Sequence, residues 1–258
     1  MKDKLESELI TLDKKRLNIR KKYKSKLINA KKQSNKKDFI FFPKSIISEN
    51  NYQLRYGLSW LQNGFIIKKG DNVIAVDPGV NFMFRLTESG FDVSSITHIF
   101  ISHSHLDYSA DANVLMDFLI RGKKAVKIIA PKSVFDEKVI SDFHSGITVK
   151  FPVNHSVIII DKNSEVELFN GYKMTFMPLN HSVECYGFKI SDADKIYTYL
   201  SDTAFSKEVM TKDKKIINVN DIKDYAEDVT SYSYNNDIKE FVRESEILIY
   251  RSDKKIMR

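Results

Sequence analysis

The stretch THIFISHSHLDYSAD, residues 97–111, decides how the rest of the chain is interpreted. A short apolar run leads directly into His103, His105 and Asp107. Alternate residues of an extended segment project to the same side, so these three side chains are expected to face one way. Imidazole and carboxylate groups are common ligands of divalent cations. The stretch therefore predicts a metal site where a strand ends, although a His-x-His-x-Asp pattern also occurs by chance.

Three other stretches place polar residues at the ends of expected strands. The stretch MTFMPLNHSVECYGFKI, residues 174–190, puts His181 directly after a strand. The stretch KIYTYLSDTAFS, residues 195–206, puts Asp202 at the end of another. Upstream, Asp77 follows the apolar run VIAV and precedes a Pro-Gly pair. Four separate strand ends therefore offer candidate ligands.

The histidine and cysteine content limits the kind of metal site. The chain has a single cysteine, Cys185, which rules out an intrachain disulfide and a cluster of thiolate ligands. Histidine and carboxylate are left as the ligand types. The six histidines are His98, His103, His105, His144, His155 and His181. We expect His98 to be a packed strand residue, His144 and His155 to lie at the surface, and Cys185 to be a buried small hydrophobe.

Short apolar runs alternate with amphipathic segments from about residue 58 onward. Strands are expected at 65–67, 73–76, 97–102, 124–130, 147–151, 157–160, 165–169, 172–178, 188–190, 195–200 and 247–250. Helices are expected at 82–89, at 111–120 with Asp111 as N-cap, at 131–139, and at a segment ending at 241–245. Strands with interspersed helices indicate an α/β domain.

The N-terminal segment differs from the rest in charge. Residues 1–37 hold 14 Lys/Arg against 4 Asp/Glu, whereas the remainder holds 27 against 30. Its apolar residues recur at helical spacing, which predicts a helix. We therefore expect a basic helical arm at 1–38 and a main domain at 39–258. The arm can be a solvated helix packed on the body or on a second copy, or a basic arm for phosphate backbones or an acidic partner.

The chain offers neither a signal peptide nor an apolar run of 18 residues, so a cytoplasmic protein without a membrane span is expected.

Over residues 55–205 the strand-end stretches resemble, in order and interval, those of the metallo-β-lactamase fold hydrolases. That pattern has Asp-x-Gly after a strand, then Thr-His, His-x-His-x-Asp-His, a later His and a Gly-Asp-Thr turn. The matching segments are Asp77-Pro78-Gly79, Thr97-His98, His103-Ser104-His105-Leu106-Asp107, His181 and Asp202-Thr203. The resemblance implies an αββα sandwich of two mixed sheets flanked by helices, here with an added N-terminal basic helix. Within the family, HSVECYGFKI, residues 181–190, is most similar to the ribonuclease Z branch.

The resemblance also implies roles for individual residues. The first ion would be bound by three imidazoles: those of His103, His105 and His181. Asp202 would bridge two ions, and Asp107 would bind the second ion and is the candidate catalytic residue. Asp77 would be an outer acceptor that fixes the tautomer of an imidazole, with the capping of a turn as the less favoured alternative.

Two departures from the family pattern concern the second ion. Tyr108 stands where the family has a ligating histidine, and a neutral phenol is a poor ligand at pH 7. The family's last ligating histidine follows the strand expected at 247–250, but this sequence has no histidine after His181. We expect one firmly bound ion, Zn²⁺ with Mn²⁺ or Fe as alternatives, and a degenerate second site. With this early end after the last strand, the sheet edge would need a cover, from the N-terminal helix or a partner chain.

The function expected from the resemblance is that of a metal-dependent hydrolase. It would be a phosphodiesterase acting on nucleic acid or nucleotides through a metal-activated water. The alternative is a non-catalytic protein of this fold that acts in binding or assembly through its basic N-terminal helix. Either could involve a homodimer or a partner chain.

Overall fold

The structure is a computed structural model that describes residues 38–43, 63–145, 155–191, 196–203, 208–210, 216–218 and 235–252. Residues 1–37 of the expected arm and the strand expected at 147–151 lie outside the described residues. The division of the chain into an arm and a main domain therefore stays a prediction.

The first sheet is mixed and has six strands. The loop of residues 101–111, called the histidine loop because it contains His103 and His105, follows strand β4 of this sheet. The strand order of the sheet is β1-β2-β3-β4-β5-β6. The bounds are β1 Asp38–Phe41, β2 Phe65–Lys69, β3 Asn72–Val76, β4 His98–Phe100, β5 Lys127–Pro131 and β6 Ser156–Ile160. The strands from β3 to β6 run parallel to one another, and β1 and β2 are antiparallel to their neighbours.

A second mixed sheet of five strands packs against the first. Its order is β13-β10-β9-β8-β7, with β13 parallel to β10 and the other pairs antiparallel. The bounds are β7 Glu165–Glu167, β8 Lys173–Pro178, β9 Tyr186–Ser191, β10 Ile196–Thr203 and β13 Ile247–Ser252. The last strand of the described chain thus fills the place next to β10. A separate pair is formed by β11 Glu208–Met210 and β12 Ile216–Asn218.

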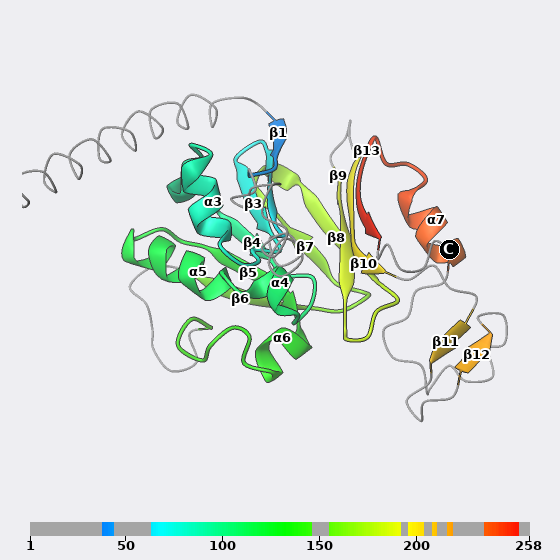
Figure 1. Ribbon diagram of the computed structural model, residues 1–258. Helices are drawn as coiled ribbons and strands as arrows, with labels where there is room; N and C mark the ends of the chain where they lie inside the picture. The colour runs from blue at the N-terminus through cyan, green and yellow to red at the C-terminus, as the bar shows by residue number, and fades with distance from the viewer. Residues whose placement is uncertain are drawn as a thin grey trace, which may run out of the picture.

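Apart from the short helix that follows His105, the helices lie on the outer faces of the two sheets (Figure 1). Their bounds are α3 Phe82–Glu88, α4 Leu106–Ser109, α5 Ala112–Arg121, α6 Lys132–Asp136 and α7 Asn235–Val242, with 3-10 turns η1 Val93–Ser95 and η2 Phe169–Gly171. Figure 1 shows α3, α5 and α6 beside the first sheet and α7 beside the second. No helix within the described ranges is both long and apolar enough to cross a membrane.

Alternation along the strands separates three layers of core. On β3, Val73 and Ala75 face the helices α3 and α5, whereas Ile74 and Val76 face the second sheet. The inter-sheet layer contains Phe65, Phe100, Phe176, Phe188 and Tyr199. The third layer joins α7 to the outer face of the second sheet and contains Met177, Leu179, Cys185, Leu200 and Ile238. Helix, sheet, sheet and helix therefore follow one another, and the expected α/β class with two mixed sheets flanked by helices is confirmed.

The role expected of Asp111 needs a correction. It precedes α5 as expected, but its side chain makes no capping bond to that helix. Its carboxylate instead accepts from the backbone N–H groups of Asn81, at 3.3 Å, and Met83, at 3.1 Å. These groups open α3, which lacks a cap of its own because Asn81 has a left-handed backbone (φ 60°) and makes no side-chain cap bond. Asp111 therefore caps the neighbouring helix.

Candidate metal centre

The loop after β4 carries the first two histidines, and Asp77 fixes its start. The backbone N–H of Ser102 donates to Asp77 Oδ1 at 2.6 Å. The N–H of Asp77 in turn donates to the carbonyl of Phe100 at 2.8 Å. Asp77 adopts a left-handed conformation (φ 48°), which turns the chain at the end of β3. The carboxyl ends of the parallel strands β3 and β4 are thus tied together beneath His103.

The loop of residues 179–185 brings the third histidine to the same place. It is closed by a hydrogen bond from Leu179 N–H to the carbonyl of Cys185 at 2.9 Å. Tyr186 N–H donates to the carbonyl of Ser102 at 3.0 Å, which joins the second sheet to the end of β4. Asn180 N–H donates to Thr203 Oγ1 at 3.2 Å. These bonds place His181 opposite the pair on the first sheet.

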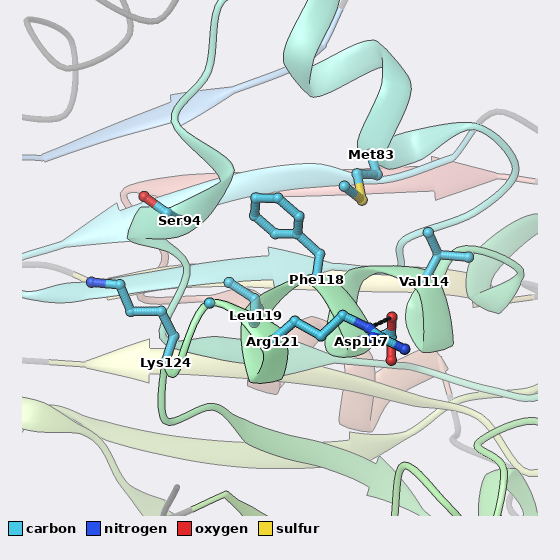
Figure 2. Close-up of a pocket in the computed structure, with 9 residues that line it drawn as sticks. Met83, Ser94, Val114, Asp117, Phe118, Leu119, Arg121 and Lys124 are labelled. Carbon is cyan, nitrogen blue, oxygen red and sulfur yellow. Dashed lines mark hydrogen bonds and ion pairs between the residues drawn. The ribbon is translucent and has the colours of Figure 1, made fainter.

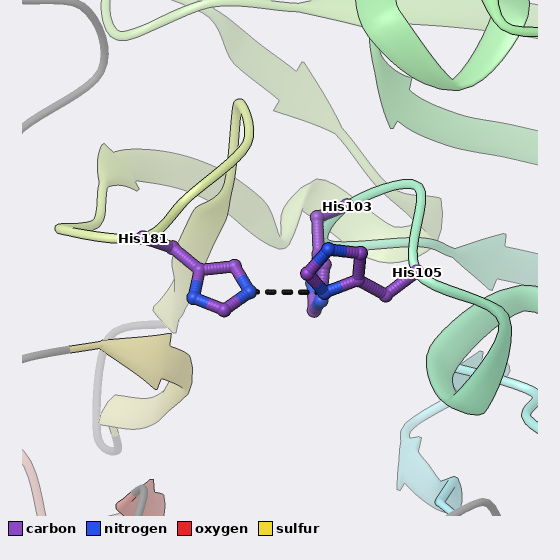
Figure 3. A group of neighbouring side chains, drawn as sticks. All are labelled: His103, His105 and His181. Carbon is purple, nitrogen blue, oxygen red and sulfur yellow. Dashed lines mark hydrogen bonds between the residues drawn. The ribbon is translucent and has the colours of Figure 1, made fainter. Parts of the chain in front are cut away.

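The three imidazoles form a nearly regular triangle (Figure 3). The ring centroids lie 4.8 Å apart for His103–His105, 4.8 Å for His103–His181 and 4.9 Å for His105–His181, with interplanar angles of 79°, 79° and 80°. His105 Nδ1 and His181 Nε2 are 3.1 Å apart. One nitrogen from each ring lies within 4.8 Å of the other two. The three rings are therefore nearly perpendicular to one another and surround a common point.

This arrangement fits a divalent cation. Nitrogens at roughly 2.1 Å from a tetrahedral ion are roughly 3.4 Å from one another, close to the separation of His105 Nδ1 and His181 Nε2. Three neutral imidazoles form a donor set that suits zinc and other first-row metals. The expected first-ion residues His103, His105 and His181 are thus brought together, and metal binding by them remains a prediction.

The buried ring of His103 is oriented by neighbours on its Nδ1 side. Ser102 Oγ lies 2.8 Å from His103 Nδ1 and 2.8 Å from Ser201 Oγ. Cys185 Sγ lies 3.6 Å from the same nitrogen. A ring held at Nδ1 presents Nε2 as the ligand atom. The contact at Nδ1 is the kind of outer support that orients ligating imidazoles. Cys185 is buried as expected, and burial raises the pKa of its thiol well above the usual range.

The two expected carboxylate ligands accept hydrogen bonds from neutral side chains. Asp107 Oδ2 accepts from Asn63 Nδ2 at 2.9 Å. Asp202 Oδ1 accepts from the hydroxyl of Tyr108. Among the described residues, the group of His, Cys, Asp and Glu side chains whose ligand atoms lie within 4.8 Å of one another consists of the three imidazoles. Asp107 and Asp202 lie outside that group, and their expected roles as metal ligands stay predictions.

Asp77 connects the two sheets beneath the site. Its Oδ2 accepts from the hydroxyl of Tyr199 on β10 at 2.6 Å, and its Oδ1 holds Ser102. It supports His103 at one remove, because the Ser102 hydroxyl contacts the imidazole. Burial raises the pKa of Asp77 from 3.8 to about 7, although the bonds from Tyr199 and Ser102 act in the opposite direction. Sequence reasoning missed Ser102 and Tyr199, which are ordinary strand-end and core residues by pattern.

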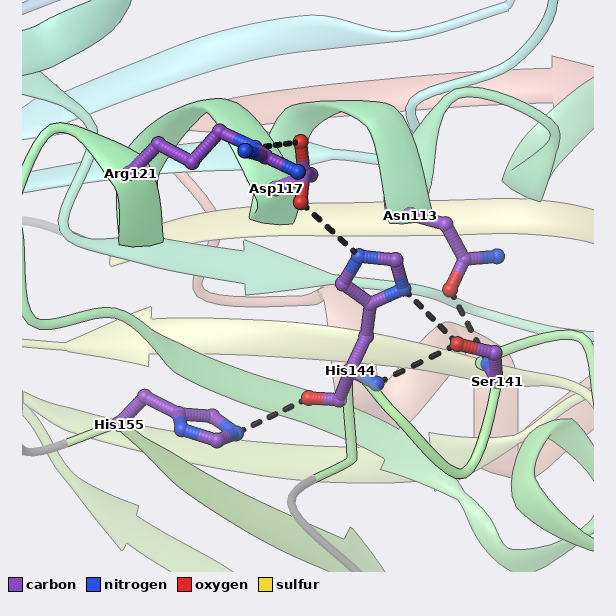
Figure 4. Close-up of polar contacts among 6 residues, drawn as sticks. All are labelled: Asn113, Asp117, Arg121, Ser141, His144 and His155. Atoms are coloured by element: carbon purple, nitrogen blue, oxygen red, sulfur yellow. Dashed lines mark hydrogen bonds and ion pairs between the residues drawn. The ribbon is translucent and has the colours of Figure 1, made fainter. Parts of the chain in front are cut away.

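The other histidines lie outside the group. His98 is fully buried, as expected, with its Nδ1 2.8 Å from Thr97 Oγ1. His144 and His155 are half-buried rather than at the surface. His144 lies between Asp117 and Ser141, whose Oγ is 2.8 Å from His144 Nδ1 (Figure 4). His155 Nε2 is 2.9 Å from the backbone carbonyl oxygen of His144. The Ser141 hydroxyl also accepts from the His144 N–H at 3.3 Å, which marks a turn contact.

A hollow of about 490 Å³ lies on the opposite side of the first sheet, among the helices (Figure 2). Its lining residues are Met83, Ser94, Val114, Asp117, Phe118, Leu119, Arg121, Gly122 and Lys124. None of them belongs to the histidine group or its supports.

The sequence model of a protein family described as Anti-Pycsar protein Apyc1 matches residues 56–225, well over half of the chain. The chain belongs to this family. In this Apyc1 family member the match includes all of the chain from β3 to the end of β10, and so contains His103, His105 and His181.

Other proteins are similar to part of this Apyc1 family member in sequence or in structure. Ribonuclease BN of Escherichia coli strain SE11 and of Shigella boydii serotype 18 are each 28% identical over 126 residues, 46% of this chain and 39% of the relative. The chain thus matches less than half the length of these relatives. Human tRNase Z, short form (ELAC1), is similar in structure, with a TM-score of 0.48, 14% identity, and 75% and 86% of the two chains covered. The metallo-β-lactamase fold protein YhfI from Bacillus subtilis gives a TM-score of 0.47, 17% identity, and 65% and 63%.

Proposed function

We propose that this chain is a metal-dependent hydrolase that cleaves phosphodiesters in nucleic acid or nucleotides. The observation that carries the proposal is the triangle of His103, His105 and His181, whose ligand nitrogens lie within 4.8 Å of one another. The partial likeness to a protein named as a ribonuclease supports the substrate class. Zn²⁺ is the proposed ion, with Mn²⁺ or Fe as alternatives.

The chain's own residues would have distinct tasks in this reaction. A divalent cation supplies Lewis-acid chemistry, since it lowers the pKa of water and polarises a phosphoryl oxygen. His103, His105 and His181 would hold it. Ser102 keeps the His103 ring in position through Nδ1. Asp107, half-buried two residues beyond His105, is the candidate acceptor of a proton from the attacking water.

Hydrolysis of bis(p-nitrophenyl) phosphate tests the proposal. The full chain is assayed with added Zn²⁺ or Mn²⁺, as wild type and as His103→Ala, with zinc content measured in parallel. His144→Ala is the matched control, because His144 is a half-buried histidine outside the group. We expect His103→Ala to lose more than about 100-fold in rate and to lose its zinc, while the control keeps both.

Equal rates of hydrolysis for wild type and His103→Ala would refute the proposal that the chain is a metal-dependent hydrolase. The alternative, a non-catalytic protein, predicts metal-independent binding to a partner that disappears when residues 1–37 are deleted.

A further inference from the structure

We propose that Tyr108 and Asn63 take the place of a second cation, so that this site holds one ion and keeps its two carboxylates in position with neutral hydrogen-bond donors. The inference rests on the proposed function, because it assigns the residues around the same site. Tyr108 and Asn63 are positioning residues in this account: they act through Asp202 and Asp107.

The first step is the location of Tyr108. Its ring centroid lies 4.3 Å from that of His103, and the side chain is only 1% exposed. The phenol ring is therefore packed directly against the histidine group. It comes from α4, one residue after Asp107, and its hydroxyl donates to Asp202 on β10. One side chain thus joins the histidine loop of the first sheet to the carboxylate of the second.

The second step is that Asp107 is held in the same manner from another direction. Asn63 Nδ2 donates to Asp107 Oδ2 at 2.9 Å. The Asn63 carbonyl accepts from the guanidinium of Arg85, which is 3% exposed and lies over the Phe82 ring at 5.7 Å. Burial lowers the pKa of Arg85 to about 10, which leaves it cationic at neutral pH. A buried cation therefore anchors the backbone of Asn63, the residue whose side-chain amide donates to Asp107.

The third step concerns charge. Two carboxylates near a shared cation would turn their oxygens toward it, as hard anionic ligands do. Here an oxygen of each is already engaged by an amide or a phenol, and a neutral phenol is a poor ligand. A second ion could bind the engaged oxygen of either carboxylate only by displacing its donor, and would otherwise have only the other oxygen of each. Such displacement costs a hydrogen bond to a charged group, which is among the stronger ones in proteins.

The test is the number of ions bound. Zn²⁺ is titrated into the chelator-treated full chain by calorimetry, and Co²⁺ absorption reports the ligand field. The variants are Tyr108→Phe, which keeps the ring on His103 and removes the donor, Tyr108→His, which supplies a nitrogen ligand, and Asn63→Ala. Tyr172→Phe is the control, because Tyr172 directly precedes β8 and His181 follows the other end of that strand.

Wild type and Tyr172→Phe should each bind one equivalent, with the same Co²⁺ spectrum. Tyr108→His should bind a second equivalent at micromolar Zn²⁺. Tyr108→Phe and Asn63→Ala should keep the first equivalent within about threefold and bind a second at least tenfold more tightly than wild type does. If Tyr108→His does not fold by circular dichroism, the two other variants decide.

Two tightly held equivalents in the wild type would overturn this inference and leave the hydrolase intact. Variants that fold but gain no second equivalent would overturn it too. A wild type that binds no ion would refute the proposed function and this inference together.

Discussion

The imidazole half of the site, His103, His105 and His181, lies beside its carboxylate half, Asp107 and Asp202, and the two satisfy their polar atoms in different ways. One nitrogen of each imidazole lies near the other two, and Ser102 and Cys185 contact the His103 ring at its Nδ1. The carboxylates accept from Asn63 and Tyr108. Candidate ligands that all follow strands in the sequence therefore need not meet at one point in space. Partners from other elements decide which of them remain directed toward an ion.

Removal of one imidazole should have the largest effect on zinc binding. His181→Ala leaves two nitrogens on the first sheet and no ligand from the 179–185 loop. We expect no stoichiometric zinc at micromolar concentration, because the lost contact is a ligand rather than an outer support. Zinc content after gel filtration measures the effect, with His155→Ala as control. One retained equivalent in His181→Ala would show that the triangle is not the site.

Neutralising the buried acid beneath the imidazole half should change how stability depends on pH. The pKa of Asp77 is raised from 3.8 to about 7 in the folded chain, so the folded state holds this proton more tightly than the unfolded state. Stability from this group is present at low pH and is lost as pH rises toward 7, by up to about 1.4 kcal/mol per pH unit. Asp77→Asn should remove that slope.

The measurement is the free energy of unfolding by urea of the metal-free chain between pH 4 and 8. The difference between variant and wild type isolates Asp77, since burial lowers the pKa of His98 to about 4 and contributes an opposite slope. Asp161→Asn, at an exposed turn where hydrogen bonds from Asn163 and Ser164 lower the pKa of the carboxyl, should leave the slope above about pH 5 unchanged. Parallel curves for Asp77→Asn and wild type would contradict the prediction.

Loss of the hydroxyl behind His103 should weaken zinc without abolishing it. Ser102→Ala removes the contact at Nδ1, and outer supports of ligating imidazoles contribute roughly 10- to 100-fold in affinity. Competition with a zinc indicator dye measures the change. Ser133→Ala, whose residue lies in α6 on the helix layer, serves as control. Unchanged affinity would mean that the ring is fixed by packing alone.

Loss of the Cys185 thiol, which also contacts His103 Nδ1, should have the smallest effect on zinc affinity. Cys185→Ala removes a contact at 3.6 Å, longer and weaker than the bond from Ser102 at 2.8 Å. We expect less than about a tenfold loss of zinc affinity in the same dye assay. A loss larger than that of Ser102→Ala would reverse the ranking of the two supports.

The sequence predicted the parts of the site that depend on local pattern. Strand β3, helix α5 and the strand-end positions of His103 and His181 follow from periodicity and turn residues. The short helix α4 was not expected, since its four residues read as part of a polar loop.

The partners of the site residues could not be predicted because they are distant in sequence. Tyr199 meets Asp77 across 122 positions, Tyr108 meets Asp202 across 94, and Asn63 meets Asp107 across 44. No periodicity carries that information. The departure at Tyr108 was visible in the sequence, but its bond to Asp202 required the two sheets to be placed together.

The capping of α3 by Asp111 has a consequence for how fast an ion can arrive. Asp111 also donates its N–H to the carbonyl of Pro78 at 2.9 Å, while Asp77 holds Ser102 at the other end of the histidine loop. Both ends of that loop are thus anchored to the same short segment after β3. An incoming ion would not have to organise this backbone, and ordering costs roughly 1–2 kcal/mol per residue. Uptake should be governed by dehydration of the ion and rotation of side chains instead of by loop closure.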